Sequence, residues 1–137
     1  MTRETFHSLC DNKGPTIILA KVGETMDIIG GYNPESWSRS NKWIETTESF
    51  ILSFKSDGNR EGIDDVILSR IKDTSTTAAI WDGDNSYDVW FGSDLQLFTG
   101  VYKCESYNKK IMNGDNFKIT DYEVFQVKKK KILTFNH

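Results

Sequence analysis

The first residues with reactive side chains are His7 and Cys10, three positions apart in a segment with helical periodicity. Side chains at i and i+3 of a helix are neighbours, so this pair could form the contact that a cysteine–histidine nucleophile requires. Such a site also needs a third group that orients the imidazole, and His137 is the only other histidine of the chain. The plainer interpretation, which we favour, is a cysteine facing the core beside a histidine that caps the helix or lies at the surface.

The second cysteine, Cys104, points to redox chemistry instead, because a sensor cysteine is an exposed thiolate. Lys103 favours a thiolate here, whereas Glu105 opposes it. An idle or buried thiol is the default interpretation. Two cysteines are too few for a disulfide framework, so the sequence predicts a reducing intracellular compartment, most simply the cytoplasm.

Asp82 begins an alternating acidic and polar run that is similar to the start of a calcium-binding loop. The motif then needs a glycine and a bidentate glutamate, and Tyr87 and Ser93 stand at those positions. The run is therefore interpreted as a solvated turn. No metal-ligand spacing and no glycine-rich phosphate loop occur elsewhere, so we expect no metal, no cofactor and no enzymatic activity.

Charge and hydropathy exclude two broad classes of partner. The net charge of -3 and the pI near 5.4 give no general attraction to nucleic acid or to anionic membranes. The longest apolar run, Ile17 to Ala20, is far shorter than the about 20 residues that a membrane-spanning helix needs. We therefore expect neither nucleic-acid binding nor membrane insertion.

The elements that must position these side chains are mainly strands. Periodicity predicts one clear helix over residues 4–11, with Phe6, Leu9 and Cys10 on one face. β-branched and alternating segments between turn signals predict seven strands, over residues 16–22, 27–32, 49–54, 66–71, 78–81, 95–99 and 121–127. The pattern predicts a mainly β (α+β) fold, a two-sheet antiparallel β-sandwich with a few peripheral short helices.

Two segments carry more specific expectations. In the strand over residues 49–54, Phe50, Leu52 and Phe54 share one face, which predicts a half-buried strand. Pro34 could open one helical turn. Trp37 and Trp43 are too large to leave exposed cheaply, so they are expected to fix the intervening loop to the sheet.

Five fragments, read in order, resemble the TLDc domain, the module of the oxidation-resistance proteins. They begin with Phe6-His7-Ser8-Leu9-Cys10-Asp11-Asn12-Lys13-Gly14-Pro15-Thr16 and continue through Ile29-Gly30-Gly31-Tyr32 and Thr47-Glu48-Ser49-Phe50-Ile51. The last two are Trp90-Phe91-Gly92-Ser93-Asp94-Leu95 and Asp121-Tyr122-Glu123-Val124-Phe125-Gln126. The resemblance covers about residues 6–127 and implies two antiparallel sheets packed face to face, with helices around the edges.

The resemblance also divides the chain. Residues 1–127 are expected to form a single TLDc-like domain that lacks the N-terminal helix and strand usual in the family. Residues 128–137 are expected to form a basic tail. A missing strand leaves an unpaired sheet edge and an uncovered apolar strip. The sequence therefore predicts possible self-association through that edge.

The family implies a non-catalytic protein-interaction module. Several TLDc proteins engage the peripheral (V1) sector of the vacuolar proton-pumping ATPase, and the family is linked to oxidative-stress resistance. The alternative is a redox-active thiol protein or weak enzyme that uses Cys104 or Cys10. Candidate interaction or family-signature residues are Gly30, Gly31, Glu48, Phe91, Gly92, Asp94, Asp121 and Glu123.

Roles for these candidates remain open at this stage. Gly30 and Gly31 lie in a strand and indicate a bulge or a close approach of backbones. Phe91 is either a core anchor or a contact hot spot. Glu48 and Glu123 are either hydrogen bonded to loops or part of an acidic contact surface, and charge reversal of Glu48, Asp94 and Glu123 would discriminate between these readings.

Overall fold

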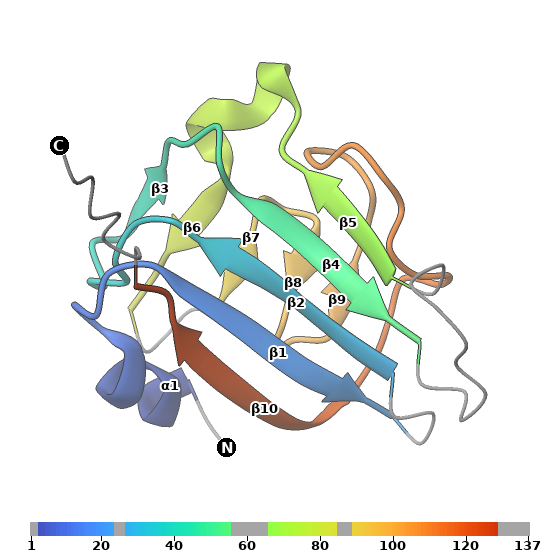
Figure 1. Ribbon diagram of the computed structural model, residues 1–137, viewed down its shortest axis with the longest axis horizontal. Coiled ribbons are helices and arrows are strands. Elements are labelled where there is room, and N and C mark those ends of the chain that lie inside the picture. Colours follow the sequence, from blue (N-terminus) through green and yellow to red (C-terminus); the bar gives the residue numbers. More distant parts are fainter. Residues whose placement is uncertain (1–2, 24–26, 56–65, 85–88, 129–137) are drawn as a thin grey trace, which may run out of the picture.

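The computed structural model describes residues 3–23, 27–55, 66–84 and 89–128, and its strands form two five-stranded antiparallel sheets (Figure 1). The first sheet has the order β10-β1-β2-β4-β5 and the second has the order β3-β6-β7-β8-β9. The first sheet contains β1 (Thr16–Val22), β2 (Asp27–Asn33), β4 (Phe50–Phe54), β5 (Val66–Arg70) and β10 (Ile119–Gln126). The second contains β3 (Lys42–Ile44), β6 (Ile80–Asp82), β7 (Trp90–Phe91), β8 (Leu95–Gln96) and β9 (Val101–Tyr102). The predicted antiparallel β-sandwich is confirmed.

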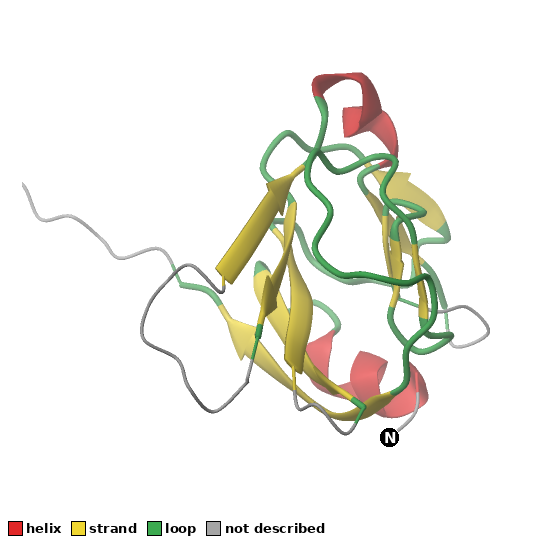
Figure 2. Ribbon diagram, turned by 90° about the vertical axis from the view of Figure 1, so that its right-hand side faces the viewer, coloured by secondary structure: helices red, strands yellow, loops and turns green. Residues whose placement is uncertain are grey.

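Two short helices lie at opposite ends of the sandwich, α1 (Arg3–Cys10) and the 3-10 helix η2 (Asp73–Ala78) (Figure 2). The predicted helix is present, but its predicted buried face is partly wrong. Phe6 and Cys10 are buried as expected, whereas Leu9 is 63% exposed and His7 is buried in its place. Among the described residues, no helix has the length and apolar character needed to cross a membrane.

The core between the sheets is built around edge-to-face aromatic contacts. The Trp37 ring lies 5.3 Å from Phe6 and 6.0 Å from Phe91, and all three side chains are fully buried. The indole Nε1–H of Trp37 donates to Thr16 Oγ1 at 2.9 Å, so this residue does fix its loop to the first sheet. Trp43 instead lies on β3 and is 40% exposed, and the helical turn expected at Pro34 is absent from this described segment.

Strand β4 is present where the alternation predicts it, but its core-facing side is the opposite one. Ile51 and Ser53 are buried toward the second sheet, while Phe50 and Phe54 remain half-buried on the outer side. A serine can face the core here because its hydroxyl has a partner. Ser53 Oγ donates to the carbonyl oxygen of Ile111 at 2.6 Å.

The second sheet differs most from the sequence-based expectation. β3, β7 and β9 are not predicted, and the predicted strand over residues 95–99 is reduced to the two residues of β8. Strands of two or three residues are too short to show alternation, so no periodic signal marks them. Their positions follow from pairing instead, as in the run Trp43↔Trp81 and Trp81↔Trp90 across β3, β6 and β7.

Candidate interaction surface

The paired glycines of β2 make room for two different neighbours. Gly30 lies so close to β1 that an added Cβ would collide with the carbonyl oxygen of Ile18. Gly31 points into the sandwich, where an added Cβ would lie 2.7 Å from the ring of Phe91. These glycines therefore set the spacing of strands and sheets, and Gly31 contacts the core rather than a partner.

The Phe91–Gly92 motif is structural as well. Phe91 is fully buried, so its interpretation as a contact hot spot is wrong and the core-anchor alternative is confirmed. Gly92 has φ of +60°, and its N–H donates to the carbonyl oxygen of Ala79 at 2.6 Å. A residue without a Cβ adopts this left-handed conformation most readily, so Gly92 lets the chain turn directly after β7.

Asp94 is fully buried and cannot belong to an acidic contact face. Its carboxylate accepts backbone N–H bonds from Glu105, Ser106 and Tyr107 at 2.9–3.0 Å. The expectation that Asp94 shares an exposed surface with Glu48 and Glu123 is therefore wrong. The sequence shows no sign of this role, because the donors are main-chain groups eleven to thirteen residues further on.

Asp82 has a matching role that the sequence interpretation missed. It is 2% exposed rather than solvated, and it accepts hydrogen bonds from the backbones of Ser38, Arg39 and Ser40 and from both serine hydroxyls. Burial by itself raises the pKa of this carboxyl, but the hydrogen bonds from Ser40 and Ser38 outweigh it and lower the pKa. Asp84, the next acidic residue of the calcium-like run, is hydrogen bonded to Asn41, and Asp88 lies outside the described residues.

The surroundings of His7 and Cys10 weigh against a nucleophilic pair. His7 is 1% exposed, and its Nδ1 is 2.8 Å from Asp11 Oδ1, so it is not the surface histidine expected from the sequence. Burial, with a contribution from Asp11, raises the pKa of Cys10 to about 11. The Cys10 thiol is therefore protonated at neutral pH, which disfavours both nucleophilic and redox roles.

Cys104 is exposed, and its Sγ lies 3.7 Å from the carbonyl oxygen of Tyr107. Exposure meets one requirement of a redox site. No group of three or more His, Cys, Asp or Glu side chains that could hold a metal is present within the described ranges.

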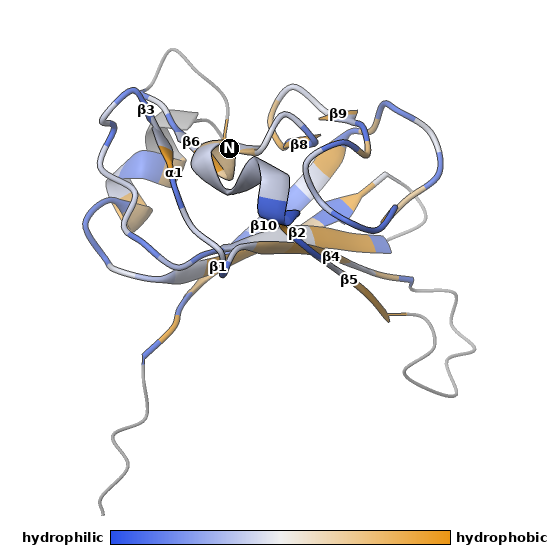
Figure 3. Cartoon of the chain, turned by 90° about the horizontal axis from the view of Figure 1, so that it is seen from above, coloured by the Kyte–Doolittle hydropathy of each residue, from blue (hydrophilic) through white to orange (hydrophobic). Residues whose placement is uncertain are grey.

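Several exposed apolar side chains lie on the outward side of the first sheet. Figure 3 shows α1 and the second sheet on one side of this sheet, and the registers place three rows of side chains on the other side. Val66, Leu68 and Phe125 on this face are 38%, 37% and 47% exposed. Its apolar members, here called the outer face, are Ile17, Leu19, Ile28, Tyr32, Phe50, Leu52, Phe54, Val66, Leu68 and Phe125.

The strand spacing gives the whole outward side of this sheet, its charged positions included, a footprint of roughly 500 Å². The largest apolar patch on a typical monomeric protein is roughly 300–600 Å² and is often functional. The sequence carried a signal for this surface, because Ile17 to Ala20 make β1 apolar on both faces, whereas a half-solvated strand alternates.

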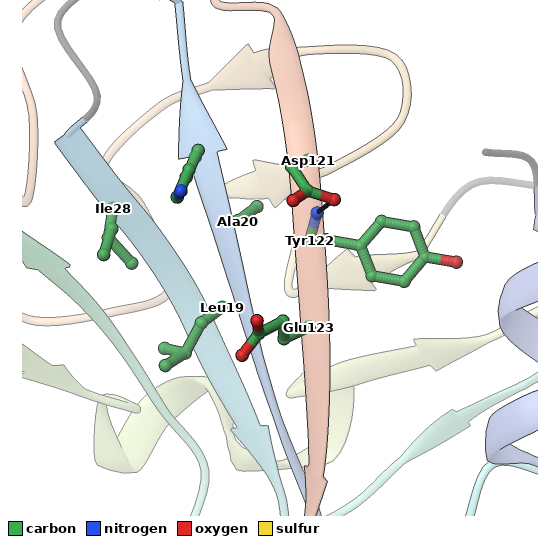
Figure 4. A pocket seen from close by; sticks show the side chains of 7 residues that line it. Leu19, Ala20, Ile28, Asp121, Tyr122 and Glu123 are labelled. Carbon is green, nitrogen blue, oxygen red and sulfur yellow. Dashed lines mark hydrogen bonds between the residues drawn. The ribbon is translucent and has the colours of Figure 1, made fainter.

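Acidic side chains border the outer face on two sides. Asp121 and Glu123 are exposed on β10, directly opposite Lys21 and Leu19 of β1. A shallow hollow of about 110 Å³ lies beside them (Figure 4). At the other end of β2, Tyr32 lies near the carboxylates of Glu48 and Glu35. Burial raises the pKa of Tyr32, and these two carboxylates raise it further.

The structure therefore separates the candidate residues into two groups. Gly30, Gly31, Phe91, Gly92 and Asp94 hold the fold together. Asp121 and Glu123 are exposed on β10, and Glu48 is exposed in the bend before β4, near Tyr32 of the outer face. An apolar surface with acidic margins is suited to binding another macromolecule by burial and charge.

Comparison with known proteins agrees with this architecture. The fold is a two-sheet β-sandwich whose sequence motifs mainly position its core and loops. The model of the TLDc domain family matches residues 1–128, so the chain belongs to this family. No curated protein matches the chain.

Proposed function

We propose that this TLDc domain is a non-catalytic protein-interaction module. The observation that carries the proposal is the outer face, where ten apolar positions of five paired strands face away from the core. Large apolar patches with a polar border are typical of protein-binding sites. The buried, protonated thiol of Cys10 and the buried imidazole of His7 weigh against the thiol-enzyme alternative.

The TLDc resemblance suggests the kind of partner. We propose that the chain acts inside the cell, contributes to oxidative-stress resistance and binds the peripheral sector of the vacuolar proton-pumping ATPase. Support comes from family membership and from an exposed surface large enough for a transient protein contact.

The test is retention of the purified peripheral sector by the immobilised chain. Leu68→Glu places a charge on the outer face and should reduce retention at least tenfold, because a buried unpaired charge opposes association. Trp43→Glu is the matched control, since Trp43 is similarly exposed but lies on the second sheet. Thermal melting should show that both variants are folded.

A double variant with Cys10→Ser and Cys104→Ser separates the two functional classes. A binding module should retain the sector at wild-type level without thiols, whereas a thiol-dependent protein should lose its activity. If the folded wild-type chain fails to retain the sector, the proposed partner is wrong.

A further inference from the structure

Strand β10 lies at an edge of the first sheet and is flanked by a groove. It contains eight residues, and within the described part of the chain β1 is its only neighbour in the sheet. Exposed edges of this length are templates for pairing with another chain, and proteins commonly cover or interrupt them.

The direction of the backbone groups on this edge follows from one hydrogen bond. The N–H of Val127 donates to the carbonyl oxygen of Pro15 on the β1 side at 2.8 Å. Because the direction alternates along an antiparallel strand, the N–H and C=O groups of Tyr122, Val124 and Gln126 point away from β1. The Tyr122 N–H, accordingly, donates to the Asp121 carboxylate of its own strand at 2.9 Å (Figure 4).

A groove of about 580 Å³ runs beside this edge. Residues of α1 and the following turn line one side, among them Leu9, which is 63% exposed, and residues 122–126 of β10 line the other. The exposure of Leu9, which the sequence placed in the core, gives the groove an apolar wall. An edge strand facing an apolar wall is the arrangement used in binding by strand addition.

We propose that β10 binds an extended segment of a partner protein, which adds to the first sheet as a sixth strand. This inference rests on the proposed function as an interaction module and names the chemistry of its partner. Side chains of an added strand alternate, so one set enters the groove beside Leu9 and the other lies next to Phe125, Glu123 and Asp121. The segment is therefore one that alternates apolar with basic residues.

Charge distinguishes this partner from a second copy of the chain. Antiparallel pairing of two β10 strands would place the Glu123 and Asp121 carboxylates of both copies on the same side of the joined sheet, within the paired segment. Like charges facing each other across strands are destabilising. A lysine or arginine in the added strand would instead pair with them.

The probe is a fluorescein-labelled octapeptide of alternating valine and lysine, compared with one of alternating valine and glutamate, by fluorescence anisotropy. We expect the valine–lysine peptide to bind at least tenfold more tightly to the full chain. Glu123→Lys should shift that preference toward the glutamate peptide, whereas Glu45→Lys, the same charge change at an exposed site by the second sheet, should not.

Proline scanning tests the strand addition itself. Val124→Pro removes an outward N–H and leaves the ladder to β1 intact, which edge strands tolerate. It should weaken peptide binding at least tenfold. Leu68→Pro is the matched control on β5, at the opposite edge of the sheet. The Ile71 N–H donates to the carbonyl oxygen of Ser49, so by alternation along the strand the Leu68 N–H points outward. Melting curves check that both variants fold.

Three outcomes would overturn this proposal. They are no binding of the valine–lysine peptide by the folded chain, equal effects of the two proline variants, or a concentration-dependent dimer that Val124→Pro abolishes. The last result would identify a second copy as the occupant. Retention of the ATPase sector without peptide binding would overturn strand addition and leave the proposed function standing. Peptide binding without retention of the sector would support strand addition and show that the proposed partner is wrong.

Discussion

At the residue scale, Asp82 and Asp94 share one arrangement. Each is a buried carboxylate next to the short strands of the second sheet, and each accepts backbone N–H bonds from a loop elsewhere in the chain. Asp82 holds residues 38–40, and Asp94 holds residues 105–107. Hydrogen bonds to a carboxylate are stronger than those between neutral groups, so these two side chains fix loops that little regular structure supports.

Asp82→Asn should therefore destabilise the chain in a pH-dependent way. Near pH 7 we expect a loss of about 1–3 kcal/mol of unfolding free energy, the cost of replacing a charged acceptor that serves a buried loop. The pKa of Asp82 is lowered in the folded state, so its stabilising contribution is fully present above the unfolded value of 3.8. This stabilising contribution is lost as the pH falls through the lower pKa that Asp82 has in the folded state.

Urea unfolding at pH 7, 5 and 3 would measure this dependence. The difference between wild type and Asp82→Asn should be constant from pH 7 to 5 and smaller at pH 3. Asp73→Asn, at an exposed position in η2, is the control and should change stability little at any pH. A difference that grows on acidification would contradict the assignment.

At the scale of elements, the sequence predicts where the longer strands of the first sheet lie, and it misses the fragments that are defined only by pairing. β1 was predicted with its observed bounds, because Thr16, Ile17 and Ile18 start a β-branched run that ends at the turn beginning with Gly23. β7 and β9 have two residues each, and only their partners define them. The core-facing side of β4 was misread because Ser53 looks like a solvent-facing residue until its acceptor, the carbonyl oxygen of Ile111, is known.

The candidate site was predictable only in part, because the role of some residues depends on partners that are not close in the sequence. Glu48 and Glu123 were chosen as carboxylates that could reach a partner, and both are exposed. Asp94, which belongs to the family motif and to the hypothesised acidic contact face, is buried instead, because its donors come from a loop that sequence spacing does not bring near. The groove beside β10 depends on the orientation of α1, whereas the periodicity of Phe6, Leu9 and Cys10 predicts Leu9 on the buried face.

The contact between β2 and β7 gives a prediction at this scale. Gly31→Ala places a methyl group 2.7 Å from the Phe91 ring, which is fully buried and has little room to move. Overpacking of this kind costs about 1–3 kcal/mol, so the unfolding free energy should fall by that amount. Chemical denaturation of the single variant would measure the loss.

A double-mutant cycle with Phe91→Leu identifies the cause. If the clash with the ring is responsible, Gly31→Ala should cost at least 0.5 kcal/mol less in the Phe91→Leu background, since contacting residues couple by about 0.5–3 kcal/mol. An identical cost in both backgrounds would mean that backbone effects in β2, and not the contact between sheets, explain the loss.

At the scale of the whole molecule, the first sheet is apolar on both sides while the second sheet covers one of them. Figure 3 shows the described elements gathered on that inner side. The opposite side bears the outer face, and its β10 margin bears both the acidic residues and the groove. The outer face and the groove thus meet at β10, where Phe125 belongs to both.

This asymmetry predicts that the native chain binds a hydrophobic dye through the outer face. Replacing Val66, Leu68 and Phe125 together by serine should at least halve the dye fluorescence, because these are the most exposed apolar side chains there. Stability should change little, since exposed substitutions usually lie within about 0.5 kcal/mol each. By contrast, Ile51→Ser, on the core side of β4, should lower the unfolding free energy by several kcal/mol and raise dye binding. If the folded triple variant bound as much dye as wild type, the accessible apolar surface of this domain would lie elsewhere, and the outer face would lose its role in association.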